Sequence, residues 1–214
     1  MVTIWGRPGA YNVQKVLWFI HELGLVFTHV DVGSVAGDLD SKEFLAMNPH
    51  GRVPLIKDND SYIWESNTIL RYLAASYGAE HYWSSDPLER SLLERWMDWE
   101  LATLQVDFLS LFWKYYRTPQ DLRDNKAIVI AQQRCDRNVI VLEQQLSAHP
   151  FVAGERFSLA DICVGTSFYR YFNMGIDVPV LPNVLKWYKK LSTRPAYQKI
   201  IQIPFDDLKG RQSY

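Results

Sequence analysis

Strand-like sequence is confined to the first part of this chain, and that asymmetry limits the folds available to it. Short runs rich in β-branched and aromatic residues cover residues 2–5, 26–32, 53–57 and 62–64. After residue 88 the apolar residues recur instead at the three- and four-residue spacing of amphipathic helices. We therefore predict an α/β domain followed by an all-α domain.

The first domain alternates strands with helices and then forms a hairpin. Apolar residues at helical spacing over residues 13–23 are followed by Gly24, and a capping-box-like sequence from Asp40 begins a short second helix. A turn at residues 58–61 joins the last two strands, and a helix over residues 67–77 follows. The order βαβαββα, with a parallel first pair of strands, is a thioredoxin-like arrangement.

A polar segment separates the two domains. We expect the thioredoxin-like domain to cover residues 1–79, a linker to cover residues 80–87, and an all-helical bundle to cover residues 88–214. Helical periodicity predicts about five helices in the bundle. Their expected ranges are 88–113, 122–146, 159–172, 184–191 and 196–201.

Charge and cysteine content exclude several classes of function. The formal net charge of −1 gives no electrostatic footprint for nucleic acid, so we expect no nucleic-acid partner. Cys135 and Cys163 lack CxxC spacing and are too few for a disulfide framework, so we expect no metal site and a reducing cytoplasm. The N-terminus lacks a signal-peptide pattern, and no apolar run approaches the ~18 residues of a membrane span. We expect no membrane association.

A proline at the front of the third strand marks the first candidate binding element. Pro54 has no N–H for strand pairing, and a proline in this position often follows a cis peptide bond. A cis Val53-Pro54 bond turns the N–H and C=O groups of Val53 outwards, where an extended peptide can pair with them like an added strand. The alternative is an ordinary edge-strand proline.

The second candidate element is Glu65-Ser66, where a strand meets the N-terminus of a helix. The Ser66 hydroxyl, the free amides of the first turn and the positive end of the helix dipole suit a carboxylate, while Glu65 suits an ammonium group. The pair therefore fits the head of an α-amino acid. The alternative is a plain N-cap beside an acid that complements the helix dipole.

Together, these two elements resemble the glutathione transferase family. The shared features are Asn-Pro-x-Gly-x-Val-Pro at residues 48–54 and Glu-Ser-Asn-x-Ile-Leu-x-Tyr-Leu at residues 65–73, separated by a hairpin of matching length. The opening Trp-Gly-Arg, followed by Asn-Val-Gln-Lys-Val-Leu-Trp at residues 12–18, is similar to bacterial members. The resemblance covers about residues 2–200, so the tail at residues 202–214 is unmatched.

The second domain also carries a structural motif of the family. Residues 154–161 resemble its capping box, in which Ser158 and Asp161 satisfy each other's backbone amides. The role of this motif is to hold a helix N-terminus, so we assign it no chemistry.

The resemblance implies a glutathione site in the first domain. Val53 would pair its backbone with the cysteinyl part of glutathione, and Pro54 would be cis. Glu65 and Ser66 would hold the γ-glutamyl group, and Arg52 would reach the glycyl carboxylate. A solvated surface role for Arg52 remains the alternative.

One position departs from the family pattern. The family activates the glutathione thiol with a Tyr, Ser or Cys in the loop after the first strand, but Ala10 occupies that place. Some members use an Asn at the equivalent of Asn12, whose amide can donate to a thiolate, and we take Asn12 as the catalytic candidate. Tyr11 is the neighbouring alternative, and Asn12 as a mere helix cap is another.

Aromatic residues near the end of the first long helix of the second domain form the candidate electrophile pocket. In the family this region faces the glutathione sulfur, and Tyr11 would contribute from the first domain. Buried packing in the helical bundle explains the same rings. The cluster consists of Phe108, Phe112, Trp113, Tyr115 and Tyr116.

The resemblance implies an enzyme of detoxification that conjugates glutathione, as co-substrate, to small hydrophobic electrophiles, with peroxide reduction or dehalogenation as variants. The alternative is a glutathione-binding or protein-binding module with the same fold and little turnover, which the missing hydroxyl at Ala10 would permit. We also expect a homodimer, because the helix from Leu88 and the region at residues 62–77 offer more apolar surface than a monomer usually exposes.

Overall fold

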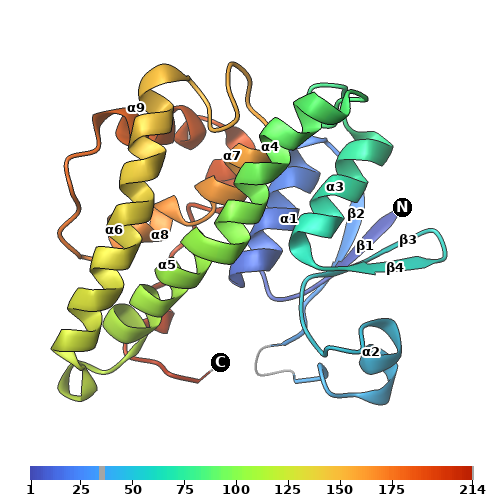
Figure 1. Cartoon of the computed structure of the whole chain (residues 1–214). Helices are drawn as coiled ribbons and strands as arrows, with labels where there is room; N and C mark the ends of the chain where they lie inside the picture. The colour runs from blue at the N-terminus through green and yellow to red at the C-terminus, as the bar shows by residue number, and fades with distance from the viewer. Residues whose placement is uncertain (34–36, 214) are drawn as a thin grey trace.

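The computed structural model describes residues 1–33 and 37–213. A four-stranded sheet with its helices forms the first part of the chain, and helices alone form the second part, as Figure 1 shows. The predicted combination of a thioredoxin-like domain and a helical domain is confirmed. Among the described residues, no helix is both long enough and apolar enough to cross a membrane.

The sheet has the strand order β2-β1-β3-β4, in which only β1 and β2 run parallel. The strands are β1 (Val2–Trp5), β2 (Phe27–Val30), β3 (Leu55–Asp58) and β4 (Ser61–Trp64). The second and third strands are shorter than predicted. The third begins only at Leu55, because Pro54 has no N–H to offer a neighbouring strand.

Helices cover both faces of the sheet. α1 (Tyr11–Glu22) packs beside α3 (Ser66–Tyr77) on one face, and α2 (Lys42–Met47) lies on the opposite side in Figure 1. The cap of α2 is Ser41, whose hydroxyl accepts a bond from the N–H of Phe44 at 3.1 Å, so the predicted start at Asp40 was one residue early.

One long helical segment leads the second domain. It begins with α4 (Pro87–Trp99), continues through a π-helical turn (Glu100–Leu104) and α5 (Gln105–Leu111), and ends with a second π-helical turn (Phe112–Arg117). It therefore extends four residues beyond its predicted end at Trp113. π-helical turns inside α-helices often mark functional sites, and both of these turns lie close to the candidate residues discussed below.

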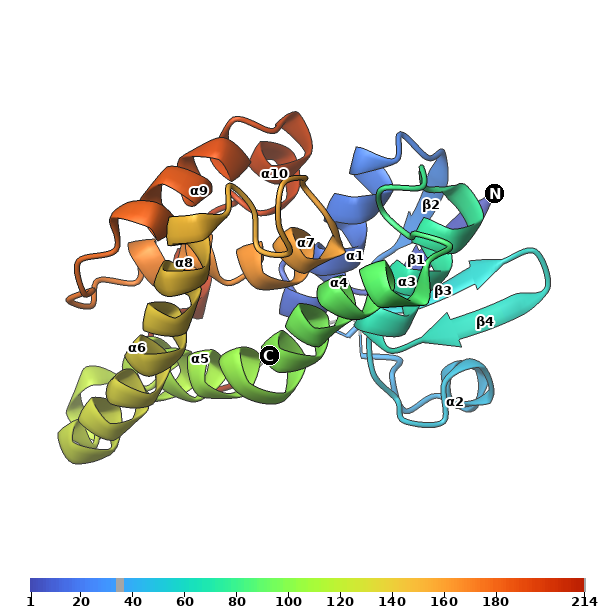
Figure 2. The same cartoon turned by 45° about the horizontal axis from the view of Figure 1, so that its top comes forward.

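Of the remaining helices, α7 (Leu159–Gly165) is buried along its whole length. The single helix predicted over residues 159–172 is two helices, because the hydroxyl of Thr166 bonds back to the C=O of Ile162 at 2.7 Å where the first one ends. The helices are α6 (Asn125–Ala148), α7 (Leu159–Gly165), α8 (Phe168–Asn173), α9 (Pro182–Ser192) and α10 (Pro195–Ile200). In Figure 2, α7 lies between α1 and the outer helices.

The capping box at the start of α7 is present. The Asp161 carboxylate accepts bonds from the N–H groups of Val152 and Ser158, both at 2.9 Å, and from Nε1 of Trp187 at 2.8 Å. Burial raises the pKa of Asp161 to about 6, against these donors, which favour the charged form. Asp161 therefore ties three segments of the helical domain together.

The two domains share one apolar core. Trp18 of α1 is fully buried and meets the ring of Tyr197 of α10 edge-on at 4.8 Å. Even the segment predicted as a linker contributes, since Tyr82 is buried against Phe19 with ring centroids 5.1 Å apart. The position of the first domain relative to the helices is consequently set by side-chain packing.

Candidate active site

The N-terminus of α1 opens the candidate site. Ala10 is the N-cap residue, with extended backbone (φ −75°, ψ 130°), and its side chain has no oxygen with which to cap the helix. The helix therefore begins at Tyr11, and Asn12 is its second residue. The alternative that Asn12 is a helix cap is wrong. The amides of this first turn, with the positive end of the helix dipole, make the site favourable for an anion.

The side chain of Asn12 connects α1 to α3. Its Oδ1 accepts a bond from the Ser66 hydroxyl, with the two oxygens 3.4 Å apart, while Asn12 itself is half-buried. Assigned in this way, the Asn12 amide keeps both of its N–H bonds for another acceptor. The contact brings two helix N-termini, and two of the predicted site residues, to one place.

Glu65 and Ser66 form the junction between β4 and α3. Glu65 is the N-cap residue, is exposed, and adopts φ 70° and ψ 115°, a backbone conformation that costs a residue other than glycine about 1–3 kcal/mol. Ser66 is buried, and its hydroxyl turns to Asn12. The alternative of a plain N-cap at Ser66 is therefore wrong, because Glu65 occupies that position without a side-chain capping bond.

The Val53-Pro54 bond is cis, as the resemblance implied. The pairing of β3 with β4 ends where Leu55 faces Trp64, so Val53 and Pro54 lie at the same end of the hairpin as Glu65 and Ser66. The structure thus brings the two motifs of the sequence together at one edge of the sheet. Because β3 begins at Leu55, Val53 lies outside the ladder of strand hydrogen bonds.

Arg52 is exposed, and its carbonyl oxygen accepts a bond from the side-chain amide of Asn48 at 2.8 Å. This bond holds the turn ahead of Pro54 while leaving the guanidinium at the surface. Arg52 therefore lies next to the motif that the sequence assigned to glutathione, at its solvent side.

Tyr11 belongs to a buried polar network. Its hydroxyl donates to Oε1 of Glu100 at 2.9 Å and also contacts the hydroxyl of Ser167. Burial, followed by the charge of Glu100, raises the pKa of Tyr11 well above its usual value. The Tyr11 hydroxyl therefore faces the domain junction, and it stays protonated at neutral pH.

The same network contains an ion pair that water does not reach. Nζ of Lys15 lies 2.8 Å from Oε2 of Glu100, and both side chains have no exposed surface. Nζ also contacts Oδ1 of Asn67 at 3.3 Å and Oε1 of Gln105 at 3.4 Å. Glu100 begins the first π-helical turn of the long helix, so the pair fixes that turn against α1 and α3.

A cavity of about 220 Å³ adjoins the start of α1. Of the residues predicted for the electrophile pocket, Tyr11, Phe112 and Trp113 lie in its wall, and Ala10 lies beside them. Phe108 and Tyr116 are buried and stack against Phe112, with ring centroids 5.9 Å and 5.2 Å away. Tyr115 turns towards the loop after α8, because its hydroxyl donates to the C=O of Gly175.

The sequence analysis did not predict several of the residues that line this cavity. Arg170 is almost fully buried in α8 and donates to the C=O of Gly9 and to Oε1 of Gln14, at 2.7 Å and 2.9 Å. An arginine within an otherwise apolar predicted helix was the signal that could have revealed it. Phe205 of the tail also lies in the wall, where helical periodicity gave no indication.

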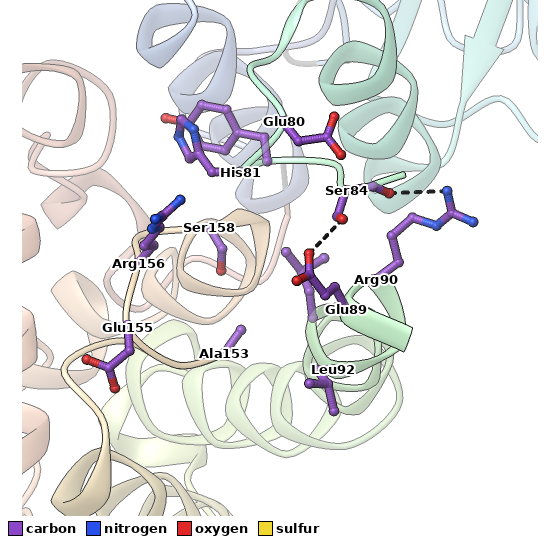
Figure 3. Close-up of a pocket in the computed structure, with 12 residues that line it drawn as sticks. Glu80, His81, Ser84, Glu89, Arg90, Leu92, Ala153, Glu155, Arg156 and Ser158 are labelled. Atoms are coloured by element: carbon purple, nitrogen blue, oxygen red, sulfur yellow. Dashed lines mark hydrogen bonds between the residues drawn. The ribbon is translucent and has the colours of Figure 1, made fainter. Parts of the chain in front are cut away.

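A wider cavity lies elsewhere, between residues 80–93 and residues 153–158, with a volume of about 360 Å³ (Figure 3). Its polar groups are partly engaged with one another, since the Ser84 hydroxyl donates to Glu89 at 2.7 Å and Arg90 donates to the C=O of Ser84. None of the predicted site residues lines it. We place the candidate site at the smaller cavity, because Ala10 and Tyr11, at the N-terminus of α1, lie in its wall.

Within the described part of the chain, no cluster of three or more metal-ligating side chains occurs. Both cysteines are buried thiols, and burial raises the pKa of Cys135 and of Cys163 to about 12. Neither thiol is therefore ionised at neutral pH, so neither is a nucleophile.

Two family models match the chain: the glutathione S-transferase N-terminal domain at residues 1–75 and its C-terminal domain at residues 103–195. The chain is 38% identical over 206 residues to glutathione S-transferase GstB of Escherichia coli (strain K12), covering 95% of this chain and 99% of that protein.

Solved structures are similar as well. A theta class glutathione S-transferase from Xanthomonas axonopodis pv. citri, solved with glutathione bound, superposes with a TM-score of 0.90 at 39% identity, covering 95% of this chain and 98% of that one. A glutathione S-transferase from Pseudomonas fluorescens gives a TM-score of 0.80 at 26% identity, covering 91% of this chain and 96% of that one.

Proposed function

The chain belongs to the glutathione S-transferase family and is a glutathione transferase with glutathione as co-substrate, and we propose from this premise which residues bind each part of glutathione. The γ-glutamyl group binds at Glu65 and Ser66, and the cysteinyl backbone pairs with Val53 beside the cis Pro54. Arg52 binds the glycyl carboxylate. The convergence of the N-termini of α1 and α3, through the contact between Asn12 and Ser66, carries this proposal.

Asn12 stabilises the glutathione thiolate. Lowering the pKa of a thiol by about two units from its free value of ~8.5 requires only ~2.7 kcal/mol. A hydrogen bond to a charged group contributes about 1.5–3 kcal/mol, and the amides at the start of α1 add to it. Because the Asn12 side chain and these amides lie at the same helix end, no hydroxyl at position 10 is required.

The surroundings of Tyr11 support giving this role to Asn12. The Tyr11 hydroxyl already donates to Glu100, and its pKa is raised by burial and by that carboxylate. To reach a thiolate it would have to leave Oε1 of the buried Glu100 without its donor, which is unfavourable. Tyr11 contributes its ring to the cavity wall, where electrophiles bind.

Separate substitutions of Asn12 and Tyr11 test the assignment of the thiolate donor. With a reactive aryl halide, we expect Asn12→Ala to lower kcat by about tenfold or more and to raise the kinetic pKa of the thiol, because the donor to the thiolate is lost. Tyr11→Phe keeps the ring and should change kcat little. The assignment fails if Tyr11→Phe produces the larger loss, and equal negligible effects would leave the thiolate to the backbone amides.

The cavity beside Ala10 receives the electrophile. Its walls combine the rings of Tyr11, Phe112, Trp113 and Phe205, which suit a flat apolar molecule next to the sulfur. Phe108 and Tyr116 hold Phe112 from behind, so they shape the pocket through packing. Conjugation of small hydrophobic electrophiles gives the protein a detoxifying role. None of these contacts favours a binding module without turnover.

The protein acts as a homodimer. β4, the end of α3 and the start of α4 expose large apolar side chains, namely Tyr62 at 42%, Tyr77 at 42%, Leu88 at 68% and Leu92 at 40%. Such surface is usually covered in solution. Light scattering at micromolar concentration should therefore give twice the chain mass of 25.0 kDa, and a value near the single chain mass would contradict the dimer.

The cytoplasm is the proposed compartment. Glutathione is a reducing co-substrate, and two buried free thiols are stable where disulfides do not form. We also propose the domain boundaries expected from the sequence, with a linker at residues 80–87, which overlaps the segment between the end of α3 at Tyr77 and the start of α4 at Pro87.

A further inference from the structure

The tail of the chain, residues 202–213, lies beyond the family's C-terminal domain, whose match ends at residue 195. It nevertheless returns to the end of the long helix (Figure 1). The N–H of Gly210 donates to the C=O of Tyr116 at 2.9 Å. The buried Arg117 donates to the C=O of Arg211 and to the C=O of Ser213, both at 2.8 Å. Backbone bonds thus hold the tail in place independently of its side chains.

Held in this position, the tail forms part of the wall of the candidate electrophile cavity. Phe205 is only 6% exposed and lies 5.0 Å from the ring of Tyr116 and 6.0 Å from that of Phe112. The tail residues that line the cavity are Pro204, Phe205, Asp207, Leu208 and Arg211. An electrophile in this cavity therefore contacts a segment that the family match does not include.

The wall of this cavity is rich in arginine. Arg7, Arg117, Arg170 and Arg211 line it, and Asp207 is the one carboxylate in the same lining. The guanidinium of Arg170 also lies over the rings of Phe112 and Phe205, at 5.6 Å and 5.9 Å from their centroids. Guanidinium groups beside aromatic rings suit a ligand that combines a planar apolar ring with an anionic substituent.

We propose that the tail completes the electrophile site and that the site selects aromatic electrophiles carrying an anionic group, with Arg211 as a specificity-determining residue. The proposal rests on the transferase function described above. Arg211 is exposed at the end of the tail, so it meets the outer part of a bound electrophile. The inner part lies against the rings of Tyr11 and Phe112, next to Ala10.

A matched pair of substrates tests this proposal: chlorodinitrobenzoate and its carboxamide, which differ in charge but little in shape. In both reactions the thiol proton goes to water, the sulfur forms a bond to the ring carbon, and chloride leaves with the electron pair of the broken carbon–chlorine bond. Each kcat/KM is divided by the rate constant of the uncatalysed reaction with glutathione, which removes the intrinsic difference in reactivity.

We expect the wild type to prefer the carboxylate after this correction, and the preference to fall as ionic strength rises. Arg211→Gln should lower the ratio of carboxylate to carboxamide by about two- to fivefold, the range of an exposed ion pair. Lys209→Gln is the matched control, because Lys209 is exposed on the same tail and outside the lining of the cavity. It removes the same charge and should leave the ratio unchanged.

If both substrates are turned over and their corrected kcat/KM values are equal, the preference for an anionic substrate is overturned while the transferase function stands. An equal fall of the ratio in both variants would overturn the role of Arg211, since the effect would then come from overall charge. Failure of the wild type to turn over either substrate would count against the proposed site for electrophiles as well as against the preference.

Discussion

The Glu100→Gln variant is expected to lose about 3–5 kcal/mol of its free energy of unfolding. Glu100 pairs with Lys15 at 2.8 Å, and neither side chain has any exposed surface. Replacing the carboxylate with an amide keeps the shape but leaves the ammonium of Lys15 as an uncompensated buried charge. Its other neighbours, Asn67 and Gln105, are neutral and lie at 3.3 Å and 3.4 Å, so they cannot replace the carboxylate.

Urea unfolding at a fixed protein concentration measures this loss, and the fixed concentration matters because a dimer gains stability by mass action. The matched control is Asp98→Asn, the same change two residues earlier. Asp98 is 66% exposed in its ion pair with Arg71, so its removal should cost at most about 1 kcal/mol. Equal costs for the two variants would contradict the buried-charge argument.

A second variant separates charge from packing. The double substitution Lys15→Met with Glu100→Gln removes both charges, and it should be more stable than Glu100→Gln alone, because the uncompensated ammonium is gone. If the double variant instead loses as much free energy of unfolding as the two single variants together, then shape rather than charge dominates at this junction.

The second large effect is expected in the affinity for glutathione. Ser66→Ala and Glu65→Gln should each weaken binding by about 1.5–3 kcal/mol, the contribution of a hydrogen bond to a charged group. Gln is chosen at position 65 because it keeps the side-chain length at a backbone φ of 70°. Isothermal calorimetry measures both affinities. Because the bond from Ser66 to Asn12 is long, at 3.4 Å, the hydroxyl can turn to an incoming carboxylate.

Thr68→Ala serves as the control for this series, since Thr68 is exposed on the same helix and has no assigned contact with glutathione. Its affinity should match that of the wild type. If Ser66→Ala and Glu65→Gln also bound glutathione like the wild type, the γ-glutamyl site would have to lie elsewhere.

The spacing of apolar residues predicted where the strands and helices lie, but it predicted their ends less well. The cap of α2 is Ser41 rather than the predicted Asp40, and the helix predicted at residues 159–172 is two helices. In both cases a single side-chain hydroxyl decides the boundary, by accepting the N–H of Phe44 or by donating to the C=O of Ile162. Apolar periodicity does not record such bonds, because it reports only which face is buried.

The sequence by itself determined the fold and the two motifs to which we assign glutathione binding. Val53-Pro54 and Glu65-Ser66 are short and contiguous, and each depends on local geometry: a proline before a strand and a helix N-terminus after one. Hairpin register then brings them together without help from the rest of the chain.

Only the tertiary structure decided how the contacts of the Tyr11 and Asn12 side chains differ. Tyr11 and Asn12 are adjacent in sequence, and their difference comes from Glu100, which takes the Tyr11 hydroxyl from a position 89 residues away. The candidate electrophile cavity likewise combines α1, the end of the long helix, α8 and the tail. Packing of such distant segments depends on the whole core, because buried charges and rings select partners by shape and distance rather than by spacing along the chain.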